Sequence, residues 1–320
     1  MPVCEADPWR LQYFDAVACP DDVMVPTEDG DAWKWYPKHR WVYDKLQVAD
    51  SQGFVCGPHG LEPPSFPVFS KPVFNMRGMG IGSRVIRTPR EYKANQRPGH
   101  IWMPMLEGEH VSTDVAVVDG KAVWQCHCIG AELDGGMFDY WTVLAEHRPE
   151  IEEYLASWIE RKMAGYTGMM NFETIGAKII EVHLRFADQW PDLYGGKPWV
   201  EALIALYRDG IWHFDGDRRT GYSVVLFGGH GIQYAHPPED LQEEIRATPG
   251  IESLQITFHE DRPAAWHASP PGGFRLAIVN SFDFDLACRM REKLALSFWS
   301  TQKLTPKRGR KPRDKGTDDA

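Results

Sequence analysis

The chain has 320 residues, of which 43% are hydrophobic and 25% charged, the balance of an ordinary globular protein. Its formal net charge of -10 excludes a broadly basic nucleic-acid-binding surface, because phosphate contacts need clustered Lys and Arg. The apolar runs are only strand-length and the first residues lack a signal-peptide pattern, so no membrane span or secretion is expected. Six cysteines without regular spacing indicate reduced thiols, and we expect a cytoplasmic protein.

Residues 1–43 are rich in Trp, Pro and Asp and have no clear periodicity, so an irregular N-terminal segment is expected. A short helix is predicted over about 42–52, ending at Gly53. Alternation in "FPVFSKPVF" and "SRVIRT" predicts two strands of a hairpin with a long glycine-rich tip. A strand from residue 100 and a second hairpin around "DGK" (119–121) follow.

In the second half, residues 149–164 place Ile151, Leu155 and Trp158 on one face of an amphipathic helix. Two strands joined through "TIGA" follow, and later a helix, three strands and a final helix with Asp283 or Asp285 near its N-cap. Residues 132–141 are interpreted as a flexible loop. The mixture predicts an α+β fold with mostly antiparallel strands.

The stretch "KPVFNMRGMGIGS" (71–83) has glycine at every second position from 78 to 82. A dinucleotide fingerprint needs G-x-G-x-x-G before a helix, and the Walker motif needs its lysine after the glycines, so neither fits. Two interpretations stay open. The loop covers phosphates with the help of Lys71 and Arg77, or it is a mobile turn without a ligand.

The stretch "NFETIGAKIIEVHLRF" places Glu173 and Glu181 on paired strands, where two carboxylates would repel unless a cation lies between them. Oxygen ligands suit Mg²⁺, which binds one or two carboxylates together with substrate phosphates. His183 and Arg185 follow at two-residue steps and share the face of Glu181. The alternative is a solvated hairpin face with a salt bridge.

Over residues 40–195 the order of these motifs resembles the ATP-grasp enzymes: a first lysine (Lys45), a strand lysine before a glycine-rich loop, "MLEGEH", and an acid followed by E-x-[N]-x-R. The end of the chain is similar to the biotin-carboxylase-like branch. The resemblance implies an ATP-grasp fold in which two α+β subdomains with mostly antiparallel sheets clasp ATP. It places the ATP-grasp domain at 44–302, with a lid subdomain at about 62–108, after a reduced N-terminal region.

The resemblance also implies a role for each matching position. Lys45 and Lys71 would contact the ATP phosphates, assisted by Arg77. The mobile lid would comprise Gly78, Gly80, Gly82 and Ser83. The adenine would lie along the backbone from Met103 through Met105 to Leu106, and His110 would meet the ribose. Mg²⁺ would be held by Glu173, Glu181 and His183, which stands where the family has Asn. Arg185 would steady the acyl phosphate or its oxyanion.

These parts imply an ATP-dependent ligase that activates a small carboxylate as an acyl phosphate for attack by an amine. One alternative is an ATP-binding protein of the same fold without catalysis. Another uses the basic tail, residues 303–320, in which "PKRGRKP" resembles an AT-hook that binds DNA. That tail is expected to be disordered, and a homodimer is an open alternative for the oligomeric state.

Overall fold

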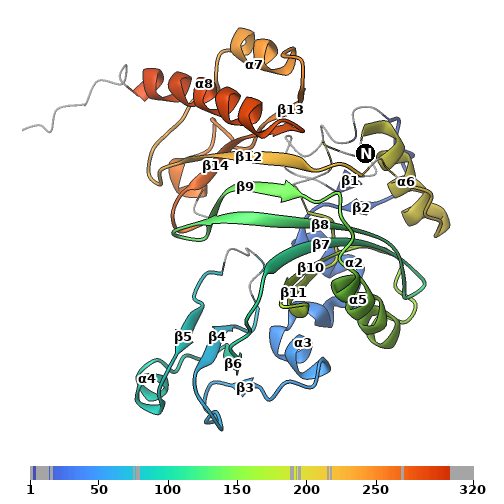
Figure 1. Ribbon diagram of the computed structural model, residues 1–320, viewed down its shortest axis with the longest axis vertical. Helices are drawn as coiled ribbons and strands as arrows, with labels where there is room; N and C mark the ends of the chain where they lie inside the picture. The colour runs from blue at the N-terminus through green and yellow to red at the C-terminus, as the bar shows by residue number, and fades with distance from the viewer. Residues whose placement is uncertain are drawn as a thin grey trace, which may run out of the picture.

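The computed structural model describes residues 3–4, 14, 17–74, 76, 80–187, 191, 193, 196–214, 216, 218–267 and 270–302. An eight-stranded sheet forms the large unit of the molecule, and a four-stranded sheet forms a small unit that projects from it (Figure 1). Arg77, Gly78 and the tail from residue 303 lie outside the described residues.

The helical elements are α2 (Asp29–Trp35), η2 (Arg40–Tyr43), α3 (Lys45–Ser51), α4 (Pro89–Ala94), α5 (Pro149–Lys162), α6 (Gly196–Asp209), α7 (Glu239–Arg246), η4 (Ala264–Trp266) and α8 (Phe284–Gln302). The strands are β1 (Val3–Cys4), β2 (Val25–Pro26), β3 (Gly57–Pro58), β4 (Val68–Pro72), β5 (Arg84–Ile86), β6 (His100–Pro104), β7 (His110–Val118), β8 (Lys121–Leu133), β9 (Met137–Val143), β10 (Gly168–Ile175), β11 (Lys178–His183), β12 (Gly221–Gly228), β13 (Ile251–Ile256) and β14 (Phe274–Ser281).

The large sheet has the strand order β11-β10-β7-β8-β9-β12-β14-β13, and every neighbouring pair is antiparallel. Its central strands are covered on both faces, so β7 is buried at every position between its two end residues. Val111, Val115 and Val117 face one side, and the alternate positions Ser112 and Asp114 face the other. The second side is where the sheet carries polar groups.

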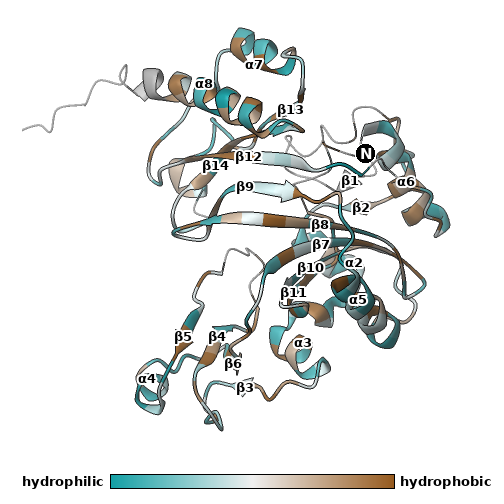
Figure 2. Ribbon diagram, in the orientation of Figure 1, coloured by the Kyte–Doolittle hydropathy of each residue, from teal (hydrophilic) through white to brown (hydrophobic). Residues whose placement is uncertain are grey.

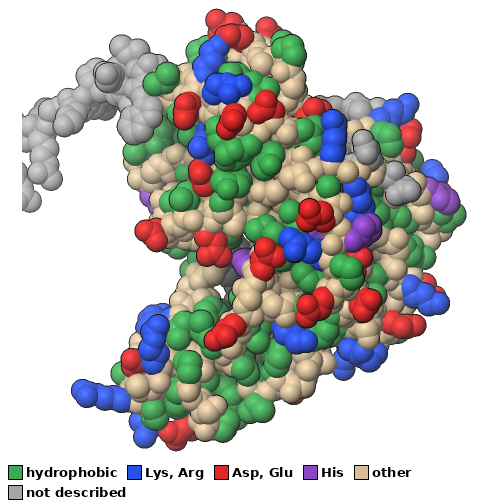
Figure 3. Space-filling view, viewed as in Figure 1, with side chains coloured by type: hydrophobic (Ala, Val, Ile, Leu, Met, Phe, Trp, Pro, Cys, Tyr) green, Lys and Arg blue, Asp and Glu red, His purple; other side chains and the backbone are tan. Residues whose placement is uncertain are grey.

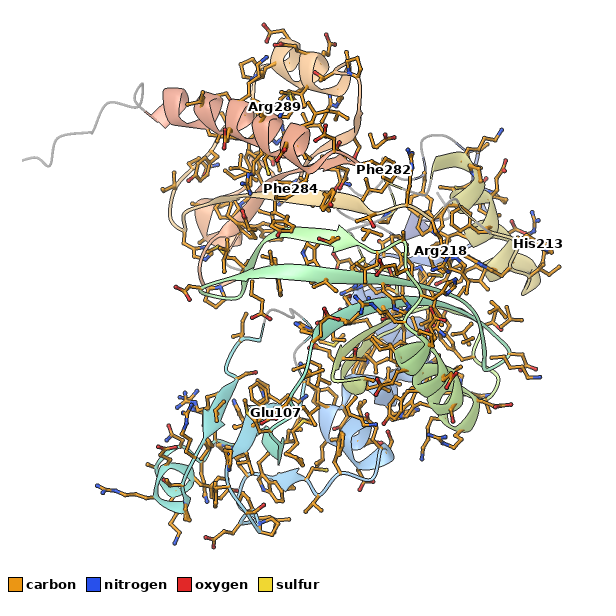
Figure 4. All side chains as sticks on the ribbon, in the orientation of Figure 1. Glu107, His213, Arg218, Phe282, Phe284 and Arg289 are labelled. Carbon is orange, nitrogen blue, oxygen red and sulfur yellow. The ribbon has the colours of Figure 1, made fainter. Side chains whose placement is uncertain are left out.

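The first face of the sheet is packed by α2, η2, α3 and α5 at one end and by α7 and α8 at the other. Phe284, labelled in Figure 4 at the start of α8, packs against Tyr140 and Tyr222, with ring centroids 4.7 and 5.1 Å from its own. Figure 2 shows hydrophobic stretches along β7 and β8 and hydrophilic stretches on α4 and α7, at the outer ends of the molecule. On the second face, α6 and β2 cover one end of the sheet, and the rest of that face borders a cavity.

The small unit comprises residues 57–104, with the strand order β3-β6-β4-β5 and one helix, α4. Its own core is small and consists of Val68, Ile86, Tyr92 and Trp102. The strands β4 and β5 pair antiparallel on either side of the glycine-rich stretch, as the alternation predicted. Thr88 caps α4 by accepting a hydrogen bond from Glu91 N–H at 3.1 Å.

The two units join where residues 105–109 lead from β6 to β7. A Cβ atom at Gly108 would lie 2.7 Å from the Cα of Gly176, and one at Gly176 would lie 2.3 Å from the carbonyl oxygen of Glu107. Both glycines have positive φ, +123° and +53°. The connection, marked by Glu107 in Figure 4, therefore rests directly on the β10–β11 turn, backbone against backbone.

The predicted helices and hairpins of the second half are confirmed, and Asp283 accepts a hydrogen bond from Leu286 N–H at the start of α8. The prediction of a flexible loop at 132–141 is wrong, because strands β8 and β9 pair up to Leu133↔Met137 and leave only a three-residue turn. The N-terminal segment is also less irregular than expected, since it contains α2 and η2. The described helices include none with the length and hydrophobicity that a bilayer span requires.

Truncating Trp158 should destabilise the fold strongly, because this side chain is fully buried between Trp41 and Phe172 and its Nε1–H donates to Ser51 Oγ. We expect Trp158→Ala to lower the free energy of unfolding by about 3–5 kcal/mol. Urea denaturation followed by circular dichroism measures this loss. The matched control is Leu296→Ala on α8, whose 70% exposed side chain should cost less than about 0.5 kcal/mol.

Candidate active site

A cavity of about 850 Å³ lies between the small unit and the second face of the large sheet. The surface is visibly hollowed between these parts of the molecule (Figure 3). Of the predicted site residues that the structure describes, all except Gly82 line this cavity: Lys45, Lys71, Gly80, Ser83, Met103, Met105, Leu106, His110, Glu173, Glu181, His183 and Arg185.

The two glutamates lie opposite each other, since Glu173 and Glu181 are register partners in β10 and β11. A β-bulge next to this pair shifts the register, so Ile179 turns into the core while Glu181 turns into the cavity. After the bulge, alternation places Val182 in the core and His183 on the same face as Glu181, toward the cavity. The bulge thus decides which way the charged side chains of β11 point.

Lys45 is the first residue of α3 and pairs with Glu181, with Nζ 2.9 Å from Oε1. The helix begins there because Asp44 accepts hydrogen bonds from the N–H groups of Leu46 and Gln47. The Lys45 side chain is 6% exposed and that of Glu181 is 17% exposed. A buried pair of this kind holds both groups in place, because either one alone would be an uncompensated charge.

Lys71 extends from β4 of the small unit to the edge of the large sheet, where its Nζ donates to the carbonyl oxygen of Ile180 at 2.7 Å. Burial, followed by the charge of nearby Lys45, lowers the pKa of Lys71 to about 7 against the opposing charge of Glu181. An anion placed beside both lysines would relieve their repulsion and favour the charged form of Lys71.

His110 binds Glu173 through Nε2, and its Nδ1 lies 3.4 Å from Oε1 of Glu132. Burial disfavours the charged imidazole, but the hydrogen bond and charge of Glu173 outweigh it and raise the pKa of His110 to about 9. Burial also raises the pKa of Glu173, and the bond and charge of His110 reverse this and lower it. The site therefore holds a second carboxylate–cation pair beside Lys45 and Glu181.

Asp29, in the N-terminal helix α2, is a site residue that the sequence analysis missed. Its Oδ2 accepts from His183 Nδ1 at 3.0 Å and from Arg185 Nη2 at 3.3 Å, and its Oδ1 accepts from the hydroxyl of Tyr43 at 3.1 Å. Burial would raise the pKa of Asp29, but the charges of Arg185 and His183 hold it well below its usual range. No local signal in residues 1–43 identified this aspartate, because His183 and Arg185 lie more than 150 positions along the chain.

The glycine-rich loop is described from Gly80 onward. Gly80 and Gly82 have φ of +60° and +81°, and Ser83 N–H donates to the carbonyl of Gly80 at 3.0 Å, so the described part is a tight turn that needs glycine. Gly80 and Ser83 line the cavity. Across the small unit, Met103 is buried in β6, whereas Met105 is 44% exposed at the cavity wall.

Glu173 and Glu181 fit Mg²⁺ in chemistry and in place. Each uses one carboxylate oxygen on His110 or Lys45, and no described residue binds the other oxygen. His183 fits Mg²⁺ less well, because imidazole nitrogen suits softer metals; its Nδ1 bonds Asp29 and its Nε2 lies 3.8 Å from Oε1 of Glu181. Within the described ranges, no three acidic, His or Cys side chains are grouped as metal ligands, so the predicted set of three is not formed.

Comparisons with known proteins rest on structure, because no family model and no curated protein sequence matches this chain. Phosphoribosylamine–glycine ligase from Thermotoga maritima superposes with a TM-score of 0.60 over 88% of this chain and 84% of its own, at 13% identity. L-amino acid ligase from Bacillus licheniformis superposes with a TM-score of 0.52 over 79% of this chain and 69% of its own, at 12% identity. The biotin carboxylase domain of Hydrogenobacter thermophilus 2-oxoglutarate carboxylase superposes with a TM-score of 0.53 over 83% of this chain and 67% of its own, at 16% identity.

The likeness to these neighbours covers most of this chain and establishes a shared fold. The protein has the ATP-grasp fold, as the order of its sequence motifs predicted. At 10–16% identity the neighbours establish the fold and leave the activity to be argued from the site.

Replacing one member of the Lys45–Glu181 pair should lower the free energy of unfolding more than replacing both members. We expect Glu181→Gln to lower the free energy of unfolding by about 3–5 kcal/mol, because it leaves Lys45 buried and unpaired. The double variant Lys45→Met/Glu181→Gln should recover at least about 1 kcal/mol of that loss, as a double-mutant cycle by urea denaturation would measure. In the exposed pair Lys34–Asp31, the change Asp31→Asn should cost under about 1 kcal/mol.

The lowered pKa of Lys71 predicts a pH dependence of stability. Between pH 7 and the ordinary lysine value of 10.5, the unfolded chain binds a proton that the native protein does not, so this residue makes stability rise with pH. Relative to Lys71→Met, the wild-type free energy of unfolding should gain up to about 1.4 kcal/mol per pH unit from pH 7.5 to 9.5. The exposed Lys121→Met should show no such slope difference, and a flat difference for Lys71→Met would refute the shift.

Proposed function

We propose that this protein is an ATP-dependent ligase that activates a small carboxylate as an acyl phosphate for attack by an amine. The observation that carries the proposal is one cavity that gathers two lysines, two opposed glutamates and an arginine from α3, β4, β10 and the β11 segment. The neighbouring proteins are named as ligases and a carboxylase, and the Hydrogenobacter domain was solved with ADP, magnesium ADP and bicarbonate. These names support the same reaction class.

Lys45 and Lys71 would bind the phosphates, since both are buried at the junction of the two units and repel each other until an anion lies between them. The adenine would lie along residues 103–106, with His110 toward the ribose. Gly80, Ser83 and the adjoining loop, including Gly78, Gly82 and Arg77, would close over the phosphates from the small unit.

Glu173 and Glu181 would hold Mg²⁺, which would neutralise phosphate charge when bound. For this, Glu181 would exchange Lys45 for the metal while Lys45 takes a phosphate oxygen. Both groups stay paired throughout, so no buried charge is left uncompensated.

In the reaction, an oxygen of the substrate carboxylate attacks the γ-phosphorus, the bond to the β-phosphate oxygen breaks, and ADP leaves. The amine then attacks the acyl carbon, and inorganic phosphate leaves as the tetrahedral oxyanion collapses. Arg185, held by Asp29, would stabilise the charge that develops on the acyl phosphate and the oxyanion. Closure of the small unit would keep water from the acyl phosphate.

ADP release in the presence of Mg²⁺, a carboxylate and an amine tests this function. We expect Lys71→Met to lower the rate at least about 100-fold, because a phosphate contact made in the transition state is lost, while the protein stays folded. Lys121→Met, an exposed lysine on β8, is the matched control and should keep the wild-type rate. Full activity in Lys71→Met would contradict the assignment.

The rival function is ATP binding without chemistry, and one observation favours it. The charged groups Lys45, His110 and Arg185 already have carboxylate partners in the protein itself. Calorimetric ATP binding with no ADP release across a panel of acids and amines would support that rival and exclude the ligase.

A further inference from the structure

The cavity has a second end, beyond the lysines and glutamates, that differs in chemistry from the first. It is bounded by β9, β12, the start of β14 and residues 257–267, and its apolar lining comprises Met137, Phe138, Trp141, Phe227, Trp266 and Phe274. The two ends form one continuous space, so a molecule at the second end can reach the proposed phosphate site.

Two aromatic rings of β9, packed against each other, line this end over the sheet. A Cβ atom at Gly130 would lie 2.3 Å from Cδ1 of Phe138, so the ring of Phe138 rests on the bare backbone of β8. Trp141 lies beside it, with ring centroids 4.4 Å apart and planes inclined by 37°. Glycine at this position is what allows two aromatic rings to line the cavity side by side.

Residues 257–267 and the start of β14 add further aromatic side chains to the lining. His267 stacks on Phe274 with centroids 4.8 Å apart and planes only 19° from parallel, and its Nε2 accepts from His259 N–H at 3.2 Å. Trp266 lines the cavity from η4 and yet remains 63% exposed. Met137 packs against the turn at Gly272, where a Cβ would lie 2.7 Å from its Cε. An exposed tryptophan in this aromatic lining is a surface that a ligand would cover.

The charges at this end favour an anion. Arg275 lines it, and among the described lining residues here Glu132 is the single acid, 67% exposed and turned toward His110. An aromatic lining favours a planar apolar group, and the positive charge of Arg275 suits a carboxylate attached to it.

We propose that the carboxylate substrate carries an aromatic or comparably large apolar side group, which packs against Phe138, Trp141 and Trp266 at this end of the cavity. The inference rests on the proposed ligase function, since it names the acid that this reaction activates. Burying a phenyl group there, compared with a methyl group, should raise kcat/KM by about 10- to 200-fold, the range that an apolar pocket achieves.

Hydroxylamine trapping tests the acid without knowledge of the amine, because hydroxylamine attacks the acyl phosphate, releases phosphate and leaves a measurable hydroxamate. The panel pairs 3-phenylpropanoate with propanoate and phenylalanine with alanine, with Mg²⁺ and ATP present. We expect the phenyl member of a pair to react at least about 10-fold better. Phe138→Ala and Trp266→Ala should each remove most of this preference, with the KM for ATP unchanged, and Leu296→Ala should leave both unchanged.

Equilibrium binding of the same acids, measured by saturation-transfer NMR with MgADP, separates the two hypotheses. Hydroxamate formed as well or better from the short acids overturns the inference and keeps the ligase function. Preferential binding of the phenyl acid, weakened in Trp266→Ala but without hydroxamate, supports the aromatic binding site for a carboxylate and refutes the ligase function. Equal or absent binding of both members, without hydroxamate, refutes both. Trp266 is exposed on a short turn, so its truncation should leave the fold intact.

Discussion

The buried carboxylate of Asp29 is the contact on which the arrangement of the site depends. It joins the N-terminal helix to the segment that carries His183 and Arg185, and it accepts hydrogen bonds from both side chains. Its two hydrogen bonds hold an arginine and a histidine together at one side of the cavity. The segment before residue 44 is thus a part of the site.

The polar and charged side chains of residues 181–185, in β11 and just after it, are held by two helices. Lys45 from α3 holds Glu181, and Asp29 from α2 holds His183 and Arg185. Lys71 from the small unit reaches a main-chain carbonyl of the same strand. An edge strand normally presents unpaired backbone groups that invite aggregation, and here those groups and the adjoining charges are used to assemble the cavity.

The parts of this site that sequence could predict are local. Strand alternation predicts the hairpin that carries Glu173 and Glu181, but their exact pairing depends on the β-bulge, without which Glu173 would lie opposite Ile180. Lys71 was recognisable because a strand and a glycine-rich turn surround it. Asp29 was not, since its role depends on contacts across 154 positions. Strand β9 was missed because its half-exposed residues follow two glycines, a composition that also suits a loop.

The close approach of Gly108 and Gly176 has a consequence for how such a protein can diverge. Where two backbones meet without side chains, there are no rotamers to adjust, so the pivot between the units is fixed by peptide geometry alone. Substitutions on the cavity walls could then change the substrate without altering the contact at which the two units join. The junction of the two units and the choice of substrate could therefore evolve independently.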